Sequence, residues 1–195
     1  TKIYRSITGP SEDGVKKGDK MKRLLIFSLM ILFVPGIVLA ELPLGEIPPA
    51  VTLEGDAGGR VDGTPWSSSE LKGKLFTVFY VDPDEGSLND HATAAIEKLK
   101  LPKEKTGSYA IVNMDATWKP NAVIGAGLKS AQEKNPDTIF VKDMDKLLVD
   151  KWQMKDDTSN ITVVAPDGKV VFCKGGKLSE EEVKKLIDTI QANIR

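Results

Sequence analysis

The fold of this chain is decided by Leu71–Leu88, which reads LKGKLFTVFYVDPDEGSL. The run Leu75–Val81 is rich in β-branched and aromatic residues and is apolar at odd and even positions, which predicts a central strand covered on both faces. Pro83 and Gly86 end that strand, and Ser87 is placed to cap a helix. Apolar residues then recur on one helical face at Leu88, Ala92, Ala95, Ile96 and Leu99. The stretch therefore predicts a strand, a loop and a helix.

The approach to this strand resembles that of the thioredoxin and peroxiredoxin superfamily, in which Leu-x-Gly-Lys leads into an apolar strand, a short loop and a helix. In that superfamily the loop carries the redox chemistry. Laid over the same junction, this chain has Glu85-Gly86-Ser87-Leu88 about where Cys-x-x-Cys would stand. A peroxidatic Thr-x-x-Cys has no match either. The resemblance implies the scaffold without its usual thiol reagent.

Two segments precede the part of the chain that is expected to fold. Residues 1–20 are polar and lack apolar periodicity, which is typical of an upstream, non-native or mis-started segment before Met21. Residues 21–40 have a basic start, an apolar core of about fifteen residues and small or apolar residues at the end, which predicts a secretory signal peptide. An uncleaved membrane anchor is the alternative, although the core is short for a span. We expect residues 41–195 to form a single domain in the periplasm.

The composition of residues 41–195 limits the partners. They carry 20 lysine and arginine residues against 25 aspartate and glutamate residues, so the net charge is about −5. This balance argues against a nucleic-acid partner and against stable membrane association after signal cleavage. The single cysteine, Cys173, excludes an intramolecular disulfide. The partner that remains is a protein, a peptide or a small molecule, and no cofactor is expected.

The rest of the chain supplies further strands and helices. Val51–Glu54 predicts an edge strand that turns through three glycines into Arg60-Val61, as an N-terminal hairpin. Gly125 and Gly127 lie inside an expected helix, which predicts close packing or a kink. The other expected elements are a buried strand over 109–114, a helix from 118 to 135, a strand over 138–141, a packed segment over 147–152, a hairpin of 161–164 with 170–173, and a helix after the capping box 179–182.

This order of elements is the thioredoxin order. It predicts an α/β, thioredoxin-like fold: a central mixed β-sheet flanked by helices on both faces, with an N-terminal hairpin extension. Four segments narrow the resemblance, namely 111–113, 149–153, 163–170 and 178–183. With the secretory leader, they are similar to the YtfJ family of periplasmic thioredoxin-fold proteins over nearly all of 41–195. That family is functionally uncharacterised, so the resemblance implies fold and compartment but no chemistry.

Cys173 is the candidate catalytic residue if the protein is redox-active. It lies within a predicted strand, far in sequence from the helix start at Ser87, whereas reactive thiols are often placed at a helix N-terminus. The nearby Lys174 and Lys177 favour a functional thiol. The high frequency of cysteine in protein cores favours a packing role instead.

The loop after the central strand and the start of the next helix hold the candidate binding residues, which are Asp82, Asp84, Glu85, Ser87 and His91. Clustered carboxylates suit a divalent cation, but the spacing does not match an EF-hand. Carboxylates ahead of a helix also complement its dipole. A metal site needs more ligands than the single histidine, so no metal site is assigned.

The three tryptophans, Trp66, Trp118 and Trp152, are too widely spaced in sequence to indicate one cluster. Aromatic residues usually pack in the core or at its rim, and lining a groove is the alternative. We therefore expect all three to be packing residues.

Three functions stay open. The first is a non-redox binding or accessory protein that uses the end of the sheet between Asp82 and His91. The second is a one-cysteine thiol peroxidase or thiol-disulfide exchanger acting through Cys173, with a partner supplying the resolving thiol. The third is a metal-dependent binder that uses the acidic loop. The missing Cys-x-x-Cys favours the first, because thiol-disulfide oxidoreduction needs an attacking and a resolving thiol. Whether the protein is an enzyme stays open.

Overall fold

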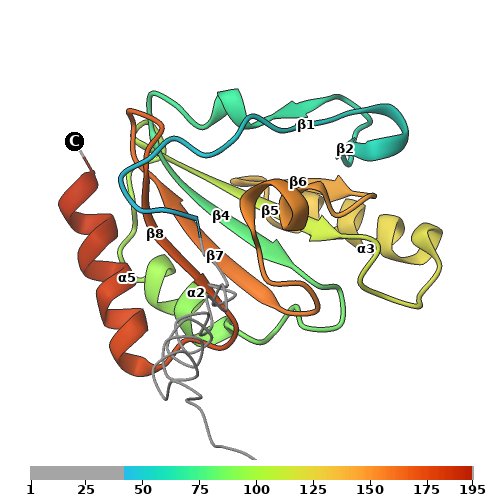
Figure 1. The fold of residues 1–195 in the computed structure, drawn as a ribbon. Helices are drawn as coiled ribbons and strands as arrows, with labels where there is room; N and C mark the ends of the chain where they lie inside the picture. The colour runs from blue at the N-terminus through green and yellow to red at the C-terminus, as the bar shows by residue number, and fades with distance from the viewer. Residues whose placement is uncertain (1–41, 195) are drawn as a thin grey trace, which may run out of the picture. The chain divides into compact units, whose positions relative to one another are not determined.

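The computed structural model describes residues 42–194, shown in Figure 1. They form a six-stranded sheet in the order β2-β6-β5-β4-β7-β8 and a two-stranded sheet of β1 and β3. The strands are β1 (Thr52–Leu53), β2 (Gly58–Arg60), β3 (Trp66–Ser67), β4 (Leu75–Val81), β5 (Thr106–Asn113), β6 (Thr138–Asp143), β7 (Ser159–Val164) and β8 (Val170–Gly175). The α-helices are α2 (Asp90–Glu97), α3 (Asn121–Lys134), α4 (Leu147–Trp152) and α5 (Glu180–Asn193). The expected leader segments, 1–20 and 21–40, lie outside the described residues.

Strand β4 is the centre of the sheet, as the opening stretch predicts. It pairs in parallel with β5 and antiparallel with β7. Val78 and Tyr80 belong to the core cluster on one face, and Leu75 and Phe79 contact the cluster on the other. The prediction of a strand covered on both faces is confirmed.

Helices cover both faces of the sheet, as Figure 1 shows. Ala92 of α2 and Leu186 of α5 belong to one core cluster on one face of the sheet. Helix α3 packs on the same face, where Leu128 contacts the sheet. Leu148 and Trp152 of α4 pack on the opposite face with β1 and β3. The mixed sheet with helices on both faces confirms the predicted thioredoxin-like class. No helix between residues 42 and 194 is long and apolar enough to cross a membrane.

Two of the three tryptophans meet in the core. Trp66 and Trp152 are both fully buried, with ring centroids 6.4 Å apart in an edge-to-face arrangement. Tyr109 makes a second edge-to-face contact with Trp66 at 5.8 Å. The packing prediction is therefore confirmed for these two residues. It is wrong for Trp118, whose exposed fraction is 87%.

The pairing inside the N-terminal extension differs from the prediction. Leu53 of β1 pairs with Trp66 of β3, and the glycine-rich β2 instead joins the main sheet antiparallel to β6. Gly58 explains the pairing of β2 with β6. A Cβ added at this position would overlap the carbonyl oxygen of Lys142, so the two strands approach more closely than a side chain would allow.

Both edge strands of the main sheet contact other parts of the chain. At one edge, Gly45 donates to the carbonyl of Val170 at 2.7 Å, and Val170 donates to Glu46 at 2.9 Å. At the other edge, Arg60 of β2 donates its backbone N–H to the carbonyl of Thr64 at 2.9 Å. The chain itself therefore occupies backbone groups on the outer side of β2 and β8.

Of the two expectations for the glycines of α3, close packing or a kink, close packing is wrong. A Cβ at Gly125 or Gly127 would meet no atom within 4 Å. Both residues lie within the helix, which packs on the sheet mainly through Leu128 and Ile124. Helix α3 is therefore a lightly packed element with two residues of low helix propensity.

Replacing Gly127 by alanine is expected to stabilise the protein by about 0.5–1 kcal/mol, because alanine loses less backbone entropy in a helix. The free energy of unfolding from urea titration measures this. Gly107→Ala is the matched control and is expected to destabilise, because its Cβ would overlap the ring of Phe76. A loss of stability in Gly127→Ala would contradict the account of α3.

Candidate functional site

The carboxyl ends of β4, β5 and β6 lie at one edge of the sheet because these strands are parallel. In open α/β sheets this edge is the usual place for ligands. Asp82 donates its backbone N–H to Thr158 at 3.0 Å, which brings the segment ahead of β7 to the same edge. We call this surface the carboxyl edge, and it consists of residues 82–89, 114–120, 144–146 and 154–158.

The acidic loop after β4 is fixed by its first two carboxylates. Asp82 is 5% exposed and accepts a hydrogen bond from the backbone N–H of Asp84 at 2.7 Å. Burial raises the pKa of Asp82, and the nearby charges of Asp84 and Asp157 raise it further. Asp84 forms an ion pair with Lys119 and accepts a hydrogen bond from Thr117 at 2.8 Å. These two partners lower the pKa of Asp84 and join its loop to the loop after β5.

A lysine joins the other loops of the carboxyl edge. The Lys146 amine lies 3.1 Å from a carboxylate oxygen of Asp115 and 3.2 Å from one of Asp156. Hydrogen bonds to these carboxylates raise the pKa of Lys146. Asn113 also donates to Asp156 at 2.8 Å. The loops after β5 and β6 and the segment ahead of β7 are thus held together by polar contacts.

Asp143, the last residue of β6, is fully buried below this network. Its carboxylate accepts hydrogen bonds from the backbone N–H groups of Leu147 and Leu148 at 2.9 and 3.0 Å. It also accepts one from the Tyr80 hydroxyl at 3.2 Å. Burial raises the pKa of Asp143 and that of Tyr80. Asp143 therefore has a structural role, fixing the first turn of α4 against the central strand.

Trp118 is the most exposed of the large apolar side chains in the described range, at 87%. Its neighbours Thr117 and Lys119 are both tied to Asp84. The loop therefore presents an indole ring to solvent between two residues whose side chains bond to Asp84. Exposed aromatic rings are typical of binding surfaces.

The other predicted binding residues have different surroundings. Glu85 is half-buried and Ser87 is exposed, both in the turns before α2. Ser87 does not cap the helix as predicted: α2 begins at Asp90 after Asn89. His91 is exposed, and its Nε2 lies 2.8 Å from the carbonyl oxygen of Leu178. Within residues 42–194 no three His, Cys, Asp or Glu side chains are grouped to hold a metal ion.

Asn89, which the sequence did not single out, connects three elements at this end of the sheet. Its side-chain amide donates to Gly176 at 3.0 Å and to the Ser159 hydroxyl at 3.3 Å. The side-chain oxygen of Asn89, Oδ1, accepts a hydrogen bond from the backbone N–H of Leu178 at 2.9 Å. The start of α2 is therefore bonded to β7 and to the connection between β8 and α5.

Cys173 lies in β8, paired with Thr162 of β7. The thiol is half-buried and accepts a hydrogen bond from the Thr162 hydroxyl at 3.5 Å. Cys173 packs against the core cluster on the face of α4, whereas its neighbour Phe172 packs with α2 and α5 on the other face. The sheet therefore separates the thiol from the helix that follows the thioredoxin-type loop.

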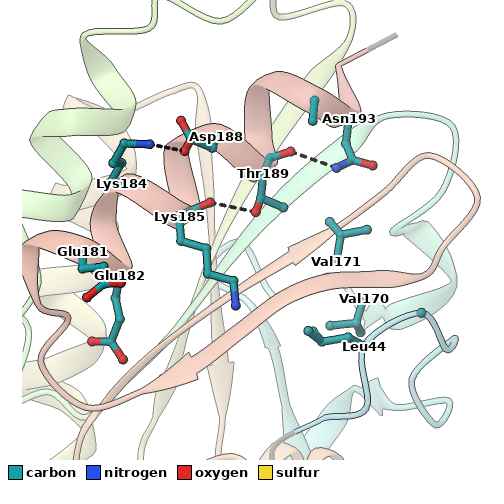
Figure 2. Close-up of a pocket in the computed structure, with 12 residues that line it drawn as sticks. Leu44, Val170, Val171, Glu181, Glu182, Lys184, Lys185, Asp188, Thr189 and Asn193 are labelled. Carbon is teal, nitrogen blue, oxygen red and sulfur yellow. Dashed lines mark hydrogen bonds and ion pairs between the residues drawn. The ribbon is translucent and has the colours of Figure 1, made fainter.

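A groove of about 860 Å³ lies between α5 and β8, with Leu44, Val170 and Val171 on the side of the sheet (Figure 2). Polar side chains on the helix side bond along α5 itself. The Lys184 amine lies 2.6 Å from a carboxylate oxygen of Asp188. The Thr189 hydroxyl donates a hydrogen bond to the backbone carbonyl of Lys185 at 2.7 Å. These groups satisfy one another and do not converge on a ligand position.

The fold and the loop at the end of β4 define a thioredoxin-like protein without the Cys-x-x-Cys pair. A structure assigned as the thiol:disulfide interchange protein DsbE of Chlorobium tepidum superimposes with a TM-score of 0.59 at 15% identity. The match covers 80% of this chain and 100% of that chain, and it shows the fold.

The chain belongs to the family described as "Bacterial protein of unknown function (YtfJ_HI0045)", whose model matches residues 50–193. It is 30% identical over 134 residues to the uncharacterized protein YtfJ of Escherichia coli (strain K12). It is 27% identical over the same length to an uncharacterized protein of Haemophilus influenzae. Each match covers 65% of this chain and 70% of the relative. The family predicted from the sequence is confirmed.

Proposed function

We propose that this protein is an exported, periplasmic binding or accessory protein that uses the carboxyl edge and no thiol chemistry. The observation that carries the proposal is the structure of the loop after β4. Where the superfamily has its redox cysteines, this chain has Glu85-Gly86-Ser87, and Asp84 is bonded to Lys119. The result is a polar surface in which side chains link the loops after β4 and β5, with an exposed Trp118 at its side. The predicted signal peptide over residues 21–40 supports export.

The charges of the carboxyl edge favour a basic partner. Two of its three lysines, Lys119 and Lys146, are paired with carboxylates of the same surface. The third, Lys155, donates to the carbonyl of Gly175 at 3.0 Å. The acidic residues of the edge outnumber the basic ones, so the surface attracts cations over a distance of about a Debye length. An indole ring beside carboxylates binds lysine or arginine side chains through cation–π contact. The partner we propose is a protein segment that combines basic and apolar side chains.

Binding of the tripeptide Lys-Leu-Lys, monitored by amide NMR shifts, tests this proposal. We expect saturable shifts in residues 82–86 and 115–119 that weaken with added salt. Trp118→Ala, which removes a contact of about 1 kcal/mol, is expected to weaken binding about fivefold. Glu-Leu-Glu is the matched control and is expected not to bind. Equal binding of both peptides, or shifts confined to other surfaces, would overturn the proposal.

Cys173→Ser separates this proposal from redox chemistry through the thiol. The variant is expected to bind Lys-Leu-Lys as the unmodified protein does, because Cys173 faces the side of the sheet that α4 covers. The native thiol is also expected to react with a thiol reagent more slowly than the unfolded chain. A native rate above the unfolded rate would instead support the one-cysteine enzyme.

A further inference from the structure

A second cavity, of about 510 Å³, lies on the face of the sheet that carries α2 and α3. Ile96 of α2 and Leu101 form one wall, and Pro136 and Asp137 form part of the other. Its floor is the amino-terminal half of β4, β5 and β6. The cavity is therefore at the opposite end of these strands from the carboxyl edge, and its size is in the range of small-molecule sites.

The floor of this cavity is a row of hydroxyl groups. Thr77 pairs with Ser108 in the sheet register, and Ser108 pairs with Thr138, so the three residues lie side by side on adjacent strands. Their sequence neighbours Val78 and Tyr109 belong to the core cluster on the other face, and side chains alternate along a strand. All three hydroxyl-bearing side chains therefore face the cavity that they line.

These hydroxyls have no protein partner in the described part of the chain. Thr77 is 5% exposed, yet no hydrogen bond links its hydroxyl, or that of Ser108 or Thr138, to another group within residues 42–194. Over the same residues, Trp66 Nε1 is the one enclosed side-chain polar atom without a partner. The Thr77 hydroxyl is therefore open to the cavity. A hydroxyl that opens into a cavity without a protein partner is free to bond to water or to a bound molecule.

The walls and the rim show which molecules fit. Phe79, Ile96 and Leu101 supply apolar contact beside the hydroxyl row. At the rim, Lys103 pairs with Asp137 at 2.6 Å, and Lys74 donates to the carbonyl of residue 103 at 3.0 Å. Within residues 42–194, Glu97 of α2 is the other charged residue of the lining, and the strands of the floor contribute none. An anion bound against the hydroxyl row would therefore find no counter-charge on the floor.

We propose that this cavity binds a small uncharged amphiphile, a molecule with a hydroxyl or amide group at one end and an aliphatic or aromatic body at the other. The polar end bonds to the row of Thr77, Ser108 and Thr138. The apolar body contacts the wall formed by Ile96 and Leu101. This site is separate from the carboxyl edge, and either one can fail without the other.

Amide NMR titrations with benzyl alcohol, toluene and benzoate test the proposal. We expect benzyl alcohol to shift the signals of residues 77, 96, 101 and 108. Thr77→Val keeps the shape of the side chain and removes the hydroxyl, and it is expected to weaken benzyl alcohol binding about 3–10-fold, the value of one hydrogen bond. Toluene binding is expected to stay unchanged in Thr77→Val.

Ser108→Ala is the second variant and changes a half-buried position. It is expected to weaken the binding of benzyl alcohol to the same extent as Thr77→Val. Ser87→Ala, at the carboxyl edge, is the control and is expected to leave binding unchanged. Equal effects of Thr77→Val on benzyl alcohol and toluene would overturn the proposal. So would benzoate binding more tightly than benzyl alcohol, because the rim lysines would then determine binding.

Discussion

Replacing Trp152 by alanine is expected to lower the free energy of unfolding by about 4 kcal/mol, within the range for large aromatic residues in cores. Trp152 is fully buried and packs edge-to-face on Trp66. Its indole N–H donates to the carbonyl of Pro49 at 2.7 Å, which joins α4 to the N-terminal segment. Alanine leaves a cavity between these elements and an unpaired carbonyl. Urea unfolding followed by far-ultraviolet circular dichroism measures the change.

Two other substitutions serve as controls for Trp152→Ala. Trp152→Phe keeps most of the ring and loses the hydrogen bond, so about 1–2 kcal/mol is expected. Trp118→Ala changes an exposed side chain and is expected to stay within about 0.5 kcal/mol of the unmodified protein. A Trp118→Ala loss that equals that of Trp152→Ala would contradict the assignment of one tryptophan to the core and the other to the surface.

Asp143→Ala is expected to destabilise the protein by roughly 3 kcal/mol, because buried donors lose their acceptor. The carboxylate accepts from the backbone of Leu147 and Leu148 and from the Tyr80 hydroxyl. Its own burial as an anion is unfavourable, so part of the loss is offset. Tyr80→Phe removes only one donor and is expected to cost about 1 kcal/mol. A neutral effect of Asp143→Ala in urea unfolding would contradict this role.

The same residue gives stability a pH dependence with a defined sign. Burial raises the pKa of Asp143 above its ordinary value of 3.8, so the folded state binds this proton more tightly than the unfolded state. The contribution of Asp143 to the free energy of unfolding is therefore largest below pH 3.8. It is lost as the pH rises through the raised pKa of Asp143 in the folded state. Asp82 adds a contribution of the same sign. Asp143→Asn is expected to reduce this downward slope when stability is measured from about pH 4 to pH 7.

The parts of the fold that were predicted correctly have strong local signals. The run Leu75–Val81 coincides with β4 because its apolar residues on both faces suit a central strand. The hairpin of β7 and β8 follows from its Asp-Gly turn, and the capping box of Ser179 and Glu182 is present at the start of α5. Each of these signals acts over a few residues and does not depend on distant partners.

The parts that were missed depend on distant contacts or unusual backbone angles. Helix α4 lies between Lys146 and Gln153, whose φ values are 46° and 55°. Neither residue type signals a left-handed conformation, so the helix was not recognised. The sequence predicts that Ser87 caps α2, whereas the helix begins after Asn89. Asn89 bonds to Gly176 and Leu178, which are far along the chain and give no local signal.

The candidate site was predicted only in part. The acidic loop could be found because carboxylates cluster in sequence at Asp82, Asp84 and Glu85. Its partner Lys119 and the exposed Trp118 lie on another loop, more than thirty residues away, and the parallel pairing of β4 with β5 brings them together. The hydroxyl row is spread over three strands, so only the sheet register reveals it.

The occupied outer sides of β2 and β8 have a consequence for the protein at high concentration. An open strand edge is a template on which a second molecule can add its own strand, and this is a common route to aggregation and fibrils. Here Val170 already bonds to Gly45 and Glu46, and Arg60 already bonds to Thr64. Strand β2 is also only three residues long, and two of these residues are glycines with positive φ. These features hinder the growth of the sheet from one molecule into the next.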